Sequence, residues 1–214
     1  MIIEANDTIL FTGDSITDCG RSREVEDQLG GGYVAMTAAH LQARLASPKL
    51  KIYNRGISGN RVCDLLGRVD ADLLDLKPTV VSILIGINDT WRRYDSGNAT
   101  DAAAFERDYR ALLEKITGEL KARVVLLEPF LIHSRPDRDA WREDLNPKID
   151  ATRKLAIEFG AELLPLDGLF AQAATQAPPA YWAGDGVHPS AAGHALIAET
   201  WLENCGWRKQ FCLA

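Results

Sequence analysis

The chain has 214 residues, of which 46% are hydrophobic and 25% are charged, and it carries a formal net charge of −6. This size and balance predict one globular domain over residues 1–214, with a core large enough to fold without a metal ion or a disulfide. Because cations are not in excess, the sequence argues against nucleic acid and anionic membranes as partners.

The chain begins Met1-Ile2-Ile3-Glu4 with no basic region, and no stretch is apolar for long enough to cross a bilayer. We therefore expect a cytoplasmic protein. Its cysteines show no CxxC or CxxxC spacing and are expected to remain thiols without a part in the function. They are Cys19, Cys63, Cys205 and Cys212.

The first predicted strand is a short apolar run over residues 8–11, which breaks at Gly13 and places Ser15 just beyond the break. In a parallel α/β sheet this is the carboxyl end of a strand, where ligands and catalytic groups gather. A serine hydroxyl becomes a nucleophile only with a neutral imidazole, a carboxylate that orients the imidazole, and donors for the developing oxyanion.

A polar, glycine-rich loop over residues 18–32 precedes a segment with helical apolar spacing over residues 33–45. A second strand is predicted over residues 51–53, followed by a glycine loop at 56–60 and a helix over 62–76. Residues 79–85 are almost all β-branched or leucine, which is typical of a strand buried on both faces.

The later chain predicts a helix over residues 102–120 and a strand over 123–127. The charge-mixed segment 137–146, which contains Trp141, predicts the solvated start of a helix that runs to residue 159 and ends at Gly160. A fifth strand is predicted over 162–166, a proline-containing loop over 177–189, and a last helix that Ser190 caps and that reaches residue 204.

Five strands that alternate with helices predict the α/β class. With right-handed crossovers they form a three-layer α/β/α sandwich around a five-stranded parallel sheet, in the flavodoxin-like order 2-1-3-4-5.

Three of the predicted strands end in glycine turns, at Ser15, Gly59 and Asn88, and strand ends of a parallel sheet share one edge. In the last loop Asp185 precedes His188 by three residues, a spacing that would let Nε2 of His188 face Ser15 while Asp185 accepts from Nδ1. Taken alone, each residue could be a turn former or a helix cap. Their occurrence together, in this order, favours one shared site.

The blocks Gly13-Asp14-Ser15-Ile16 and Gly86-Ile87-Asn88-Asp89, the loop around Gly59, and Asp185-Gly186-Val187-His188 resemble the four signature blocks of the SGNH, or GDSL-type, hydrolases. The resemblance spans nearly the whole chain, and Ile16 replaces the leucine of the family name. Residues 13–21, 54–60 and 86–94 more narrowly resemble intracellular acetylxylan esterases.

The resemblance implies Ser15 as the nucleophile, His188 as the general base and Asp185 as its orienting acid. It implies an oxyanion hole made by the backbone N–H groups of Ser15 and Gly59 and the side-chain amide of Asn88. The expected protein is a serine esterase that removes short acyl groups, most simply acetyl, from carbohydrate esters such as xylo-oligosaccharides. It would need no cofactor and no metal.

Three alternatives stay open at this point. A thioesterase or lysophospholipase of the same superfamily would share every catalytic residue. A non-catalytic carbohydrate binder could use the same sheet, although the glycine loops lack the nucleotide-binding signatures. A metal hydrolase using Asp185, His188 and His194 is disfavoured, because His194 lies six residues after His188 on the last helix.

Aromatic residues flank the proposed site. Trp91, Arg92 and Tyr94 follow Asn88, and Trp182 precedes Asp185. Flat apolar rings beside hydrogen-bonding groups suit a sugar face, so we expect these residues to bind substrate. An equally good interpretation is that they only form the wall of the pocket or pack between subunits. The aromatic residues near the end of the chain suggest a contact in a homo-oligomer. They are Trp201, Trp207 and Phe211.

Overall fold

The computed structural model describes residues 1–25 and 27–206, and its centre is a five-stranded parallel sheet. The strand order β2-β1-β3-β4-β5 confirms the prediction. The strands are β1 (Thr8–Gly13), β2 (Lys51–Gly56), β3 (Val80–Leu84), β4 (Arg123–Leu127) and β5 (Glu162–Leu164).

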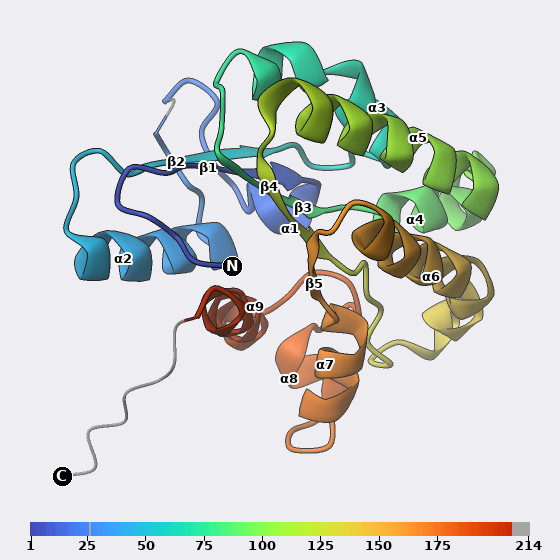
Figure 1. Cartoon of the computed structure of the whole chain (residues 1–214). Helices are drawn as coiled ribbons and strands as arrows, with labels where there is room; N and C mark the ends of the chain where they lie inside the picture. Colours follow the sequence, from blue (N-terminus) through green and yellow to red (C-terminus); the bar gives the residue numbers. More distant parts are fainter. Residues whose placement is uncertain (26, 207–214) are drawn as a thin grey trace, which may run out of the picture.

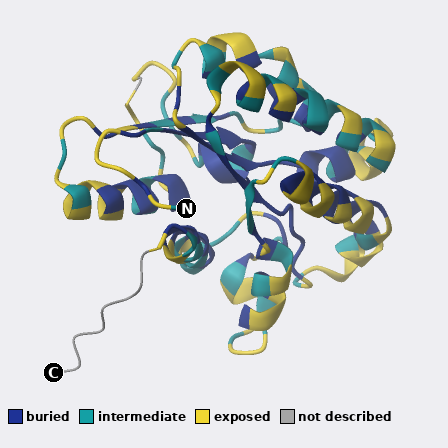
Figure 2. Cartoon of the chain, in the orientation of Figure 1, coloured by how far each residue is buried: buried dark blue, intermediate teal, exposed yellow. Residues whose placement is uncertain are grey.

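The sheet has two apolar faces, because side chains alternate along each strand. In β1, Ile9 and Phe11 belong to one buried cluster and Leu10 belongs to the other. In Figure 2 the central strands β1, β3 and β4 appear mostly dark blue between helices whose outer surfaces are largely yellow. Burial on both faces explains why the sequences of the central strands β3 and β4 are nearly continuous apolar runs.

Helices cover both faces of the sheet (Figure 1). On one face α2 (Tyr33–Leu45) and α9 (Ala191–Asn204) pack together. On the other face α3 (Val62–Gly67) packs against α5 (Ala102–Lys115), and α6 (Arg142–Glu158) lies along α5. Shorter helices are α1 (Ser15–Asp18), α4 (Ile87–Asp95), α7 (Leu166–Ala173) and α8 (Pro179–Trp182).

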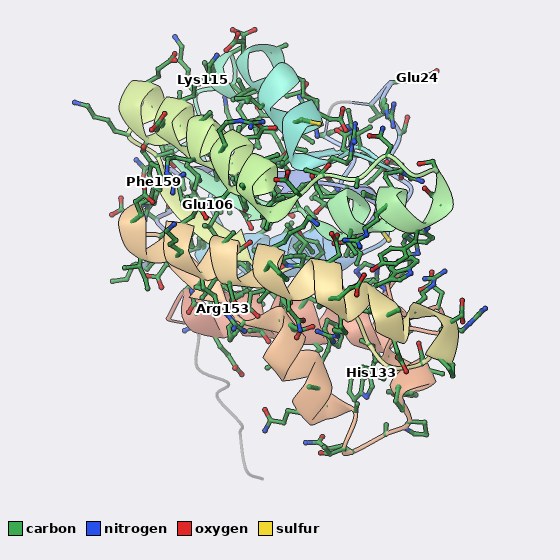
Figure 3. All side chains as sticks on the ribbon, turned by 90° about the vertical axis from the view of Figure 1, so that its right-hand side faces the viewer. Glu24, Glu106, Lys115, His133, Arg153 and Phe159 are labelled. Carbon is green, nitrogen blue, oxygen red and sulfur yellow. The ribbon has the colours of Figure 1, made fainter. Side chains whose placement is uncertain are left out.

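Ion pairs join the outer surfaces of α5 and α6. Figure 3 shows Glu106 between the two helices, where its Oε1 accepts from Arg110 on its own helix and from Lys154 on α6, each at 2.6 Å. Arg110 also donates to Glu158 of α6 at 2.8 Å. These contacts supplement the apolar packing beneath them, since exposed ion pairs stabilise a fold only weakly.

Two of the predicted helices are interrupted. The segment predicted as a helix over 62–76 forms α3 only to Gly67 and continues after a break as the π-helical turn η1 (Asp70–Leu74). The segment predicted over 102–120 leaves α-helical geometry after Lys115 and ends as the π-helical turn η2 (Ile116–Leu120). Apolar spacing alone cannot distinguish these wider turns from an α-helix.

The segment after β4 differs most from the expectation. The predicted solvated helix start over 137–146 is a 3-10 turn, η3 (Pro136–Trp141), followed by α6. Trp141 is buried rather than solvated, because its ring packs against Trp91 and Tyr94 from α4. The fifth strand ends at Leu164 rather than at residue 166, because Pro165 interrupts it and Leu166 opens α7.

The last helix begins as predicted, with the Ser190 side chain accepting from the N–H of Gly193. The interpretation of Trp201 as an oligomer contact was wrong. This residue is fully buried, and its ring centroid lies 5.3 Å from that of Phe11. Its indole N–H donates to Ser82 Oγ at 3.1 Å. The two other aromatic residues in that prediction, Trp207 and Phe211, lie outside the described residues, as does Cys212.

Within residues 1–25 and 27–206, no helix combines the length and the apolar character needed to cross a membrane. The three cysteines in this part of the chain, Cys19, Cys63 and Cys205, are free thiols.

Candidate active site

The turn after β1 fixes the position of Ser15. A side chain at Gly13 would place its Cβ 2.2 Å from the backbone oxygen of Leu84, so the adjacent strands approach too closely for any residue but glycine. Asp14 then caps the short helix α1 by accepting from the N–H of Ile16 at 3.0 Å. Ser15 is consequently the first residue of α1, at the carboxyl edge of the sheet.

A chain of hydrogen bonds joins Ser15 to the loop before α9. Ser15 Oγ lies 2.9 Å from Nε2 of His188, and Nδ1 of His188 lies 2.8 Å from Oδ2 of Asp185. The other carboxylate oxygen of Asp185 accepts from the N–H groups of His188 and Val187, at 2.8 and 2.9 Å. Because an ionised carboxylate can only accept, Nδ1 carries the hydrogen and Nε2 of the neutral ring is left to accept from Ser15.

The electrostatics of this loop favour an ionised acid beside a basic imidazole. The hydrogen bond to Asp185 raises the pKa of His188, and this effect outweighs burial, which acts in the opposite direction. Burial would raise the pKa of Asp185, but hydrogen bonds from the ring and N–H of His188 and from the N–H of Val187 bring it well below its usual range. Asp185 is therefore a fixed negative charge behind the imidazole.

The loop around Gly59 is fastened to the Ser15 turn. Oδ2 of Asp18, the last residue of α1, accepts from both the N–H and the hydroxyl of Ser58 at 2.9 Å. The N–H of Ile57 donates to the backbone oxygen of Gly13 at 3.0 Å. Gly59 itself has a φ of 84°, a conformation that favours glycine. Its backbone is thereby set beside α1.

Asn88 lies at the same edge of the sheet, four residues after the end of β3. It lies in the first turn of α4, is 4% exposed, and its Nδ2 donates to the backbone oxygen of Asn60 at 3.1 Å. An amide nitrogen carries two hydrogens, so one remains for another acceptor. The turns that carry Ser15, Gly59 and Asn88 therefore follow three adjacent strands, β1, β2 and β3, at the carboxyl edge of the sheet.

His194 takes no part in the arrangement of Asp185 and His188. Its Nδ1 accepts from the N–H of Tyr33 at 3.2 Å, and its Nε2 lies 3.4 Å from Sγ of Cys19. Burial lowers the pKa of His194 to about 4, so the ring is neutral at ordinary pH. No group of three or more His, Cys, Asp or Glu residues suited to a metal ion occurs in the described part of the chain.

Trp91 and Arg92 lie next to the hydrogen-bonded chain. The ring centroid of Trp91 is 5.9 Å from that of His188, and the Trp91 side chain is partly exposed. A guanidinium nitrogen of Arg92 is the nearest group, at 3.8 Å, to the position that a Cβ on Gly59 would occupy. Both side chains therefore border the open side of the site.

Tyr94 and Trp182 have other neighbours. The ring of Tyr94 stacks on Trp141 at 5.4 Å between centroids, and its hydroxyl donates to the backbone oxygen of Ala140 at 3.0 Å. The indole N–H of Trp182 donates to the backbone oxygen of Ala173 in α7 at 3.0 Å. Of the four aromatic and basic residues expected to bind substrate, the structure brings Trp91 and Arg92 to the site, while these two rings pack on η3 and α7.

Sequence reasoning missed Arg138, whose Nη1 donates to the backbone oxygen of Asp185 at 2.6 Å. It lies in a segment of mixed charge that resembles an ordinary solvated surface, so the sequence carries no signal for this contact. The same segment supplies Asp139, whose Oδ1 lies 2.8 Å from Nδ1 of His133. Figure 3 labels His133, whose side chain is exposed.

A second missed residue is Asn54, near the end of β2. Its Nδ2 donates to the backbone oxygens of Thr17 and Leu29, at 2.7 and 2.8 Å, and its Oδ1 accepts from the N–H of Gly56 at 2.9 Å. Asn54 is fully buried. The sequence carried no clear signal for it, because β2 reads Lys-Ile-Tyr-Asn-Arg-Gly and Asn54 lies beyond the strand predicted over residues 51–53. Its complete set of hydrogen bonds explains how a polar side chain is accommodated there.

Comparison with known proteins agrees with this geometry. The model of the GDSL-like lipase/acylhydrolase family matches residues 11–196. An acetylxylan esterase from Geobacillus stearothermophilus is 36% identical, with 97% of each chain covered. A crystal structure from Parabacteroides merdae ATCC 43184, assigned to the GDSL-like lipases, has a TM-score of 0.91 at 40% identity and covers 95% of this chain and 97% of that one.

A crystal structure of a catalytic mutant of the acetylxylan esterase from Geobacillus stearothermophilus is similarly close. Its TM-score is 0.89 at 35% identity, with 97% of this chain and 98% of that one covered. Similarity at this level extends over the whole sheet and the helices around it.

Proposed function

Because the chain belongs to the GDSL-like lipase/acylhydrolase family and is a carboxylic ester hydrolase, we propose that it removes short acyl groups, acetyl first, from carbohydrate esters. The proposed substrates are acetylated xylo-oligosaccharides. The observation that supports this proposal most strongly is the continuous hydrogen-bonded chain from Ser15 through His188 to Asp185.

In the proposed mechanism, Ser15 Oγ attacks the ester carbonyl while its proton passes to Nε2 of His188, 2.9 Å away. The C–O bond to the sugar breaks, and the His188 proton goes to the departing alcohol oxygen, which leaves an acyl-enzyme on Ser15. A water molecule then attacks the acyl carbon while His188 takes one of its protons. The bond between Ser15 Oγ and the acyl carbon breaks, the acid leaves, and His188 returns the proton to Ser15 Oγ. Asp185 keeps the ring in the required tautomer and stabilises the imidazolium that forms twice in each cycle.

We propose that three N–H groups stabilise the tetrahedral oxyanion, from the backbones of Ser15 and Gly59 and the side chain of Asn88. The positive φ of Gly59 and the anchoring of its loop to Asp18 support this role, because oxyanion donors act through a fixed orientation. The contact from Asn88 to Asn60 supports it further, since it holds the amide in place.

The proposed substrate class rests on the surroundings of His188. Trp91 offers a partly exposed indole beside the base, and Arg92 adds hydrogen-bond donors near Gly59. A sugar ring, which is apolar on its face and polar at its rim, suits such a surface. The related enzymes from Geobacillus stearothermophilus are acetylxylan esterases, which agrees with an acetylated carbohydrate.

A panel of substrates tests this proposal. The protein is assayed on acetylated xylo-oligosaccharides, acyl-CoA thioesters and lysophospholipids, with the Ser15→Ala variant as the blank. We expect acetate release from the oligosaccharides at the highest kcat/KM. A higher kcat/KM on a thioester or a lysophospholipid would contradict the proposed substrate class. Sugar binding without hydrolysis of any acetyl ester would contradict the proposed reaction.

A further inference from the structure

Arg138 contacts two neighbouring indole rings, those of Trp91 and Trp141. Its guanidinium carbon is 4.5 Å from the ring centroid of Trp91 and 5.0 Å from that of Trp141. The two rings are themselves 5.2 Å apart between centroids. A planar cation over aromatic faces is attracted by their quadrupoles, and this attraction grows as water is excluded. The side chain of Arg138 is 15% exposed, so most water is excluded here.

The same guanidinium also contacts the loop that carries the proposed base. Its Nη1 donates to the backbone oxygen of Asp185 at 2.6 Å and lies 3.5 Å from Oδ2 of this residue. That Oδ2 is the atom bound to Nδ1 of His188. The ring of Trp91, on which Arg138 lies, is in turn 5.9 Å from the His188 ring. Arg138 therefore contacts two neighbours of His188, the carboxylate of Asp185 and the ring of Trp91.

On the basis of the proposed function, we propose that Arg138 is a positioning residue of the esterase. It holds the Asp185 loop and the Trp91 ring together, so that His188 keeps one orientation toward Ser15 through the reaction cycle. Arg138 touches neither the ester nor the nucleophile and acts entirely through Asp185 and Trp91.

The charge of Arg138 adds an electrostatic effect to the geometric one. The groups that face His188 in the described structure are Asp185 in its own loop, Asp14 before α1, Arg138 in η3 and the neutral His194 on α9. Asp185 and Asp14 raise the pKa of His188, and Arg138 lowers it. The cation therefore keeps a larger share of His188 in the neutral form that a general base requires.

Arginine suits this position better than lysine. A guanidinium can lie flat on an indole while its edge donates to an oxygen, whereas an ammonium is a compact point charge with strong hydration. The Arg138→Lys substitution would keep the positive charge near His188 but would lose part of the contact that joins the Trp91 ring to the Asp185 loop. The two effects can therefore be separated by substitution.

The experiment compares full-length wild type with Arg138→Met, Arg138→Lys and the control Arg135→Met. Arg135 lies three residues earlier, is half-exposed and pairs with Asp137 rather than with the site. The His188 ring is titrated by NMR, and kcat and KM are measured on 4-nitrophenyl acetate from pH 5 to 9. If Arg138→Met does not fold, Arg138→Gln, which is neutral and keeps a donor, takes its place.

We expect Arg138→Met to raise the midpoint of the His188 titration by roughly half a pH unit or more and to lower kcat by about 10- to 100-fold. Arg138→Lys should keep the midpoint near that of wild type and recover part of kcat, and Arg135→Met should change neither. A purely structural residue would lower the melting temperature alone. An unchanged midpoint and kcat in folded Arg138→Met would overturn the proposal.

The two proposals fail in different ways. If wild type hydrolyses no ester yet the His188 midpoint rises in Arg138→Met, the electrostatic contact stands and the proposed function fails. If wild type is an active esterase and the substitution changes neither quantity, the positioning role alone fails.

Discussion

Ser15 and His188 are 173 positions apart in the chain, yet their side-chain atoms lie 2.9 Å from each other. Local structure at both ends produces this contact. The Asp14 cap holds Ser15 in the first turn of α1, and the two N–H groups that Asp185 accepts hold His188 at the end of its own loop. Each of the two side chains is thus held by short-range contacts in its own segment, and the fold brings the two segments together.

The proposed role of Asn88 as an oxyanion donor predicts a loss of kcat. Replacing Asn88 by alanine should lower kcat by about 100- to 1,000-fold, because one preorganised oxyanion donor is removed. Asn88→Asp keeps the size but also removes the donor and should lose at least as much. Steady-state assays on an acetyl ester, with the melting temperature as a control for folding, check this; a folded alanine variant with wild-type kcat would remove Asn88 from the mechanism.

The pH dependence follows from the protonation of His188. As the proposed base, His188 must be neutral, so kcat/KM should rise with pH through the His188 pKa. Since Asp185 raises that pKa, the midpoint of the acidic limb should lie above about 6.5, the ordinary value for histidine. A pH profile of kcat/KM measures it, and a rate that is flat from pH 5 to 8 would be incompatible with His188 as the base.

At the scale of elements, Asn54 joins β2 to the end of α1 and to the loop at residue 29. Asn54→Ala leaves buried backbone groups without partners, which should cost about 2 to 3 kcal/mol of unfolding free energy. Because the Ser15 and Gly59 turns are then held less firmly, kcat should also fall, by roughly 10-fold.

Urea unfolding and steady-state assays of Asn54→Ala test this, with the exposed Asn98→Ala as the matched control. If the two variants are equally stable and equally active, Asn54 does not organise the site.

The sequence predicted the elements whose own pattern was strong. β3 is a run of buried β-branched residues and leucine, α2 has clear helical spacing, and Ser190 caps α9 as expected. Helix α4 was missed because its first turn reads Ile-Asn-Asp-Thr, which is polar and turn-like. Its burial against η3 and α6 is a tertiary effect that local propensity does not contain.

The same distinction applies to the site. Ser15, Asn88 and the Asp185 to His188 spacing stand at turns that the sequence marks with glycine, so their local pattern alone makes them candidates. Arg138 has no such pattern, because its aromatic partner Trp91 comes from a different element and its own segment has the composition of a solvated surface. A residue such as Arg138, which is proposed to act on His188 only through Asp185 and Trp91, cannot be recognised from the pattern of its own segment.

At the scale of the whole molecule, His194 links three elements. It extends from α9 to the start of α2 and to Cys19 at the end of α1. In the unfolded chain its pKa is about 6.5, and burial lowers it to about 4 in the folded protein. Between these values the unfolded state binds the extra proton, so folding stability falls as the pH falls from about 6.5 to about 4.

The difference between the two pKa values of His194 corresponds to a loss of about 3 kcal/mol in the free energy of unfolding between pH 6.5 and pH 4. His194→Asn, whose side-chain oxygen can still accept from Tyr33, should show a smaller loss of stability on acidification than wild type. Urea unfolding at pH 7 and pH 4.5 measures both losses, and the comparison cancels carboxyl groups that titrate in both proteins. Equal losses would show that His194 is not a source of acid sensitivity.

In the proposed reaction, Ser15 attacks the ester and carries the acyl group, and every other role at the site depends on this step. Its most direct test is to inactivate the protein with a serine-directed phosphonate and to locate the adduct by peptide mass mapping. We predict one adduct, on Ser15, formed in proportion to the loss of acetylesterase activity, and no adduct on Ser15→Ala. Full inactivation with the adduct on another residue, or full activity with Ser15 blocked, would contradict it.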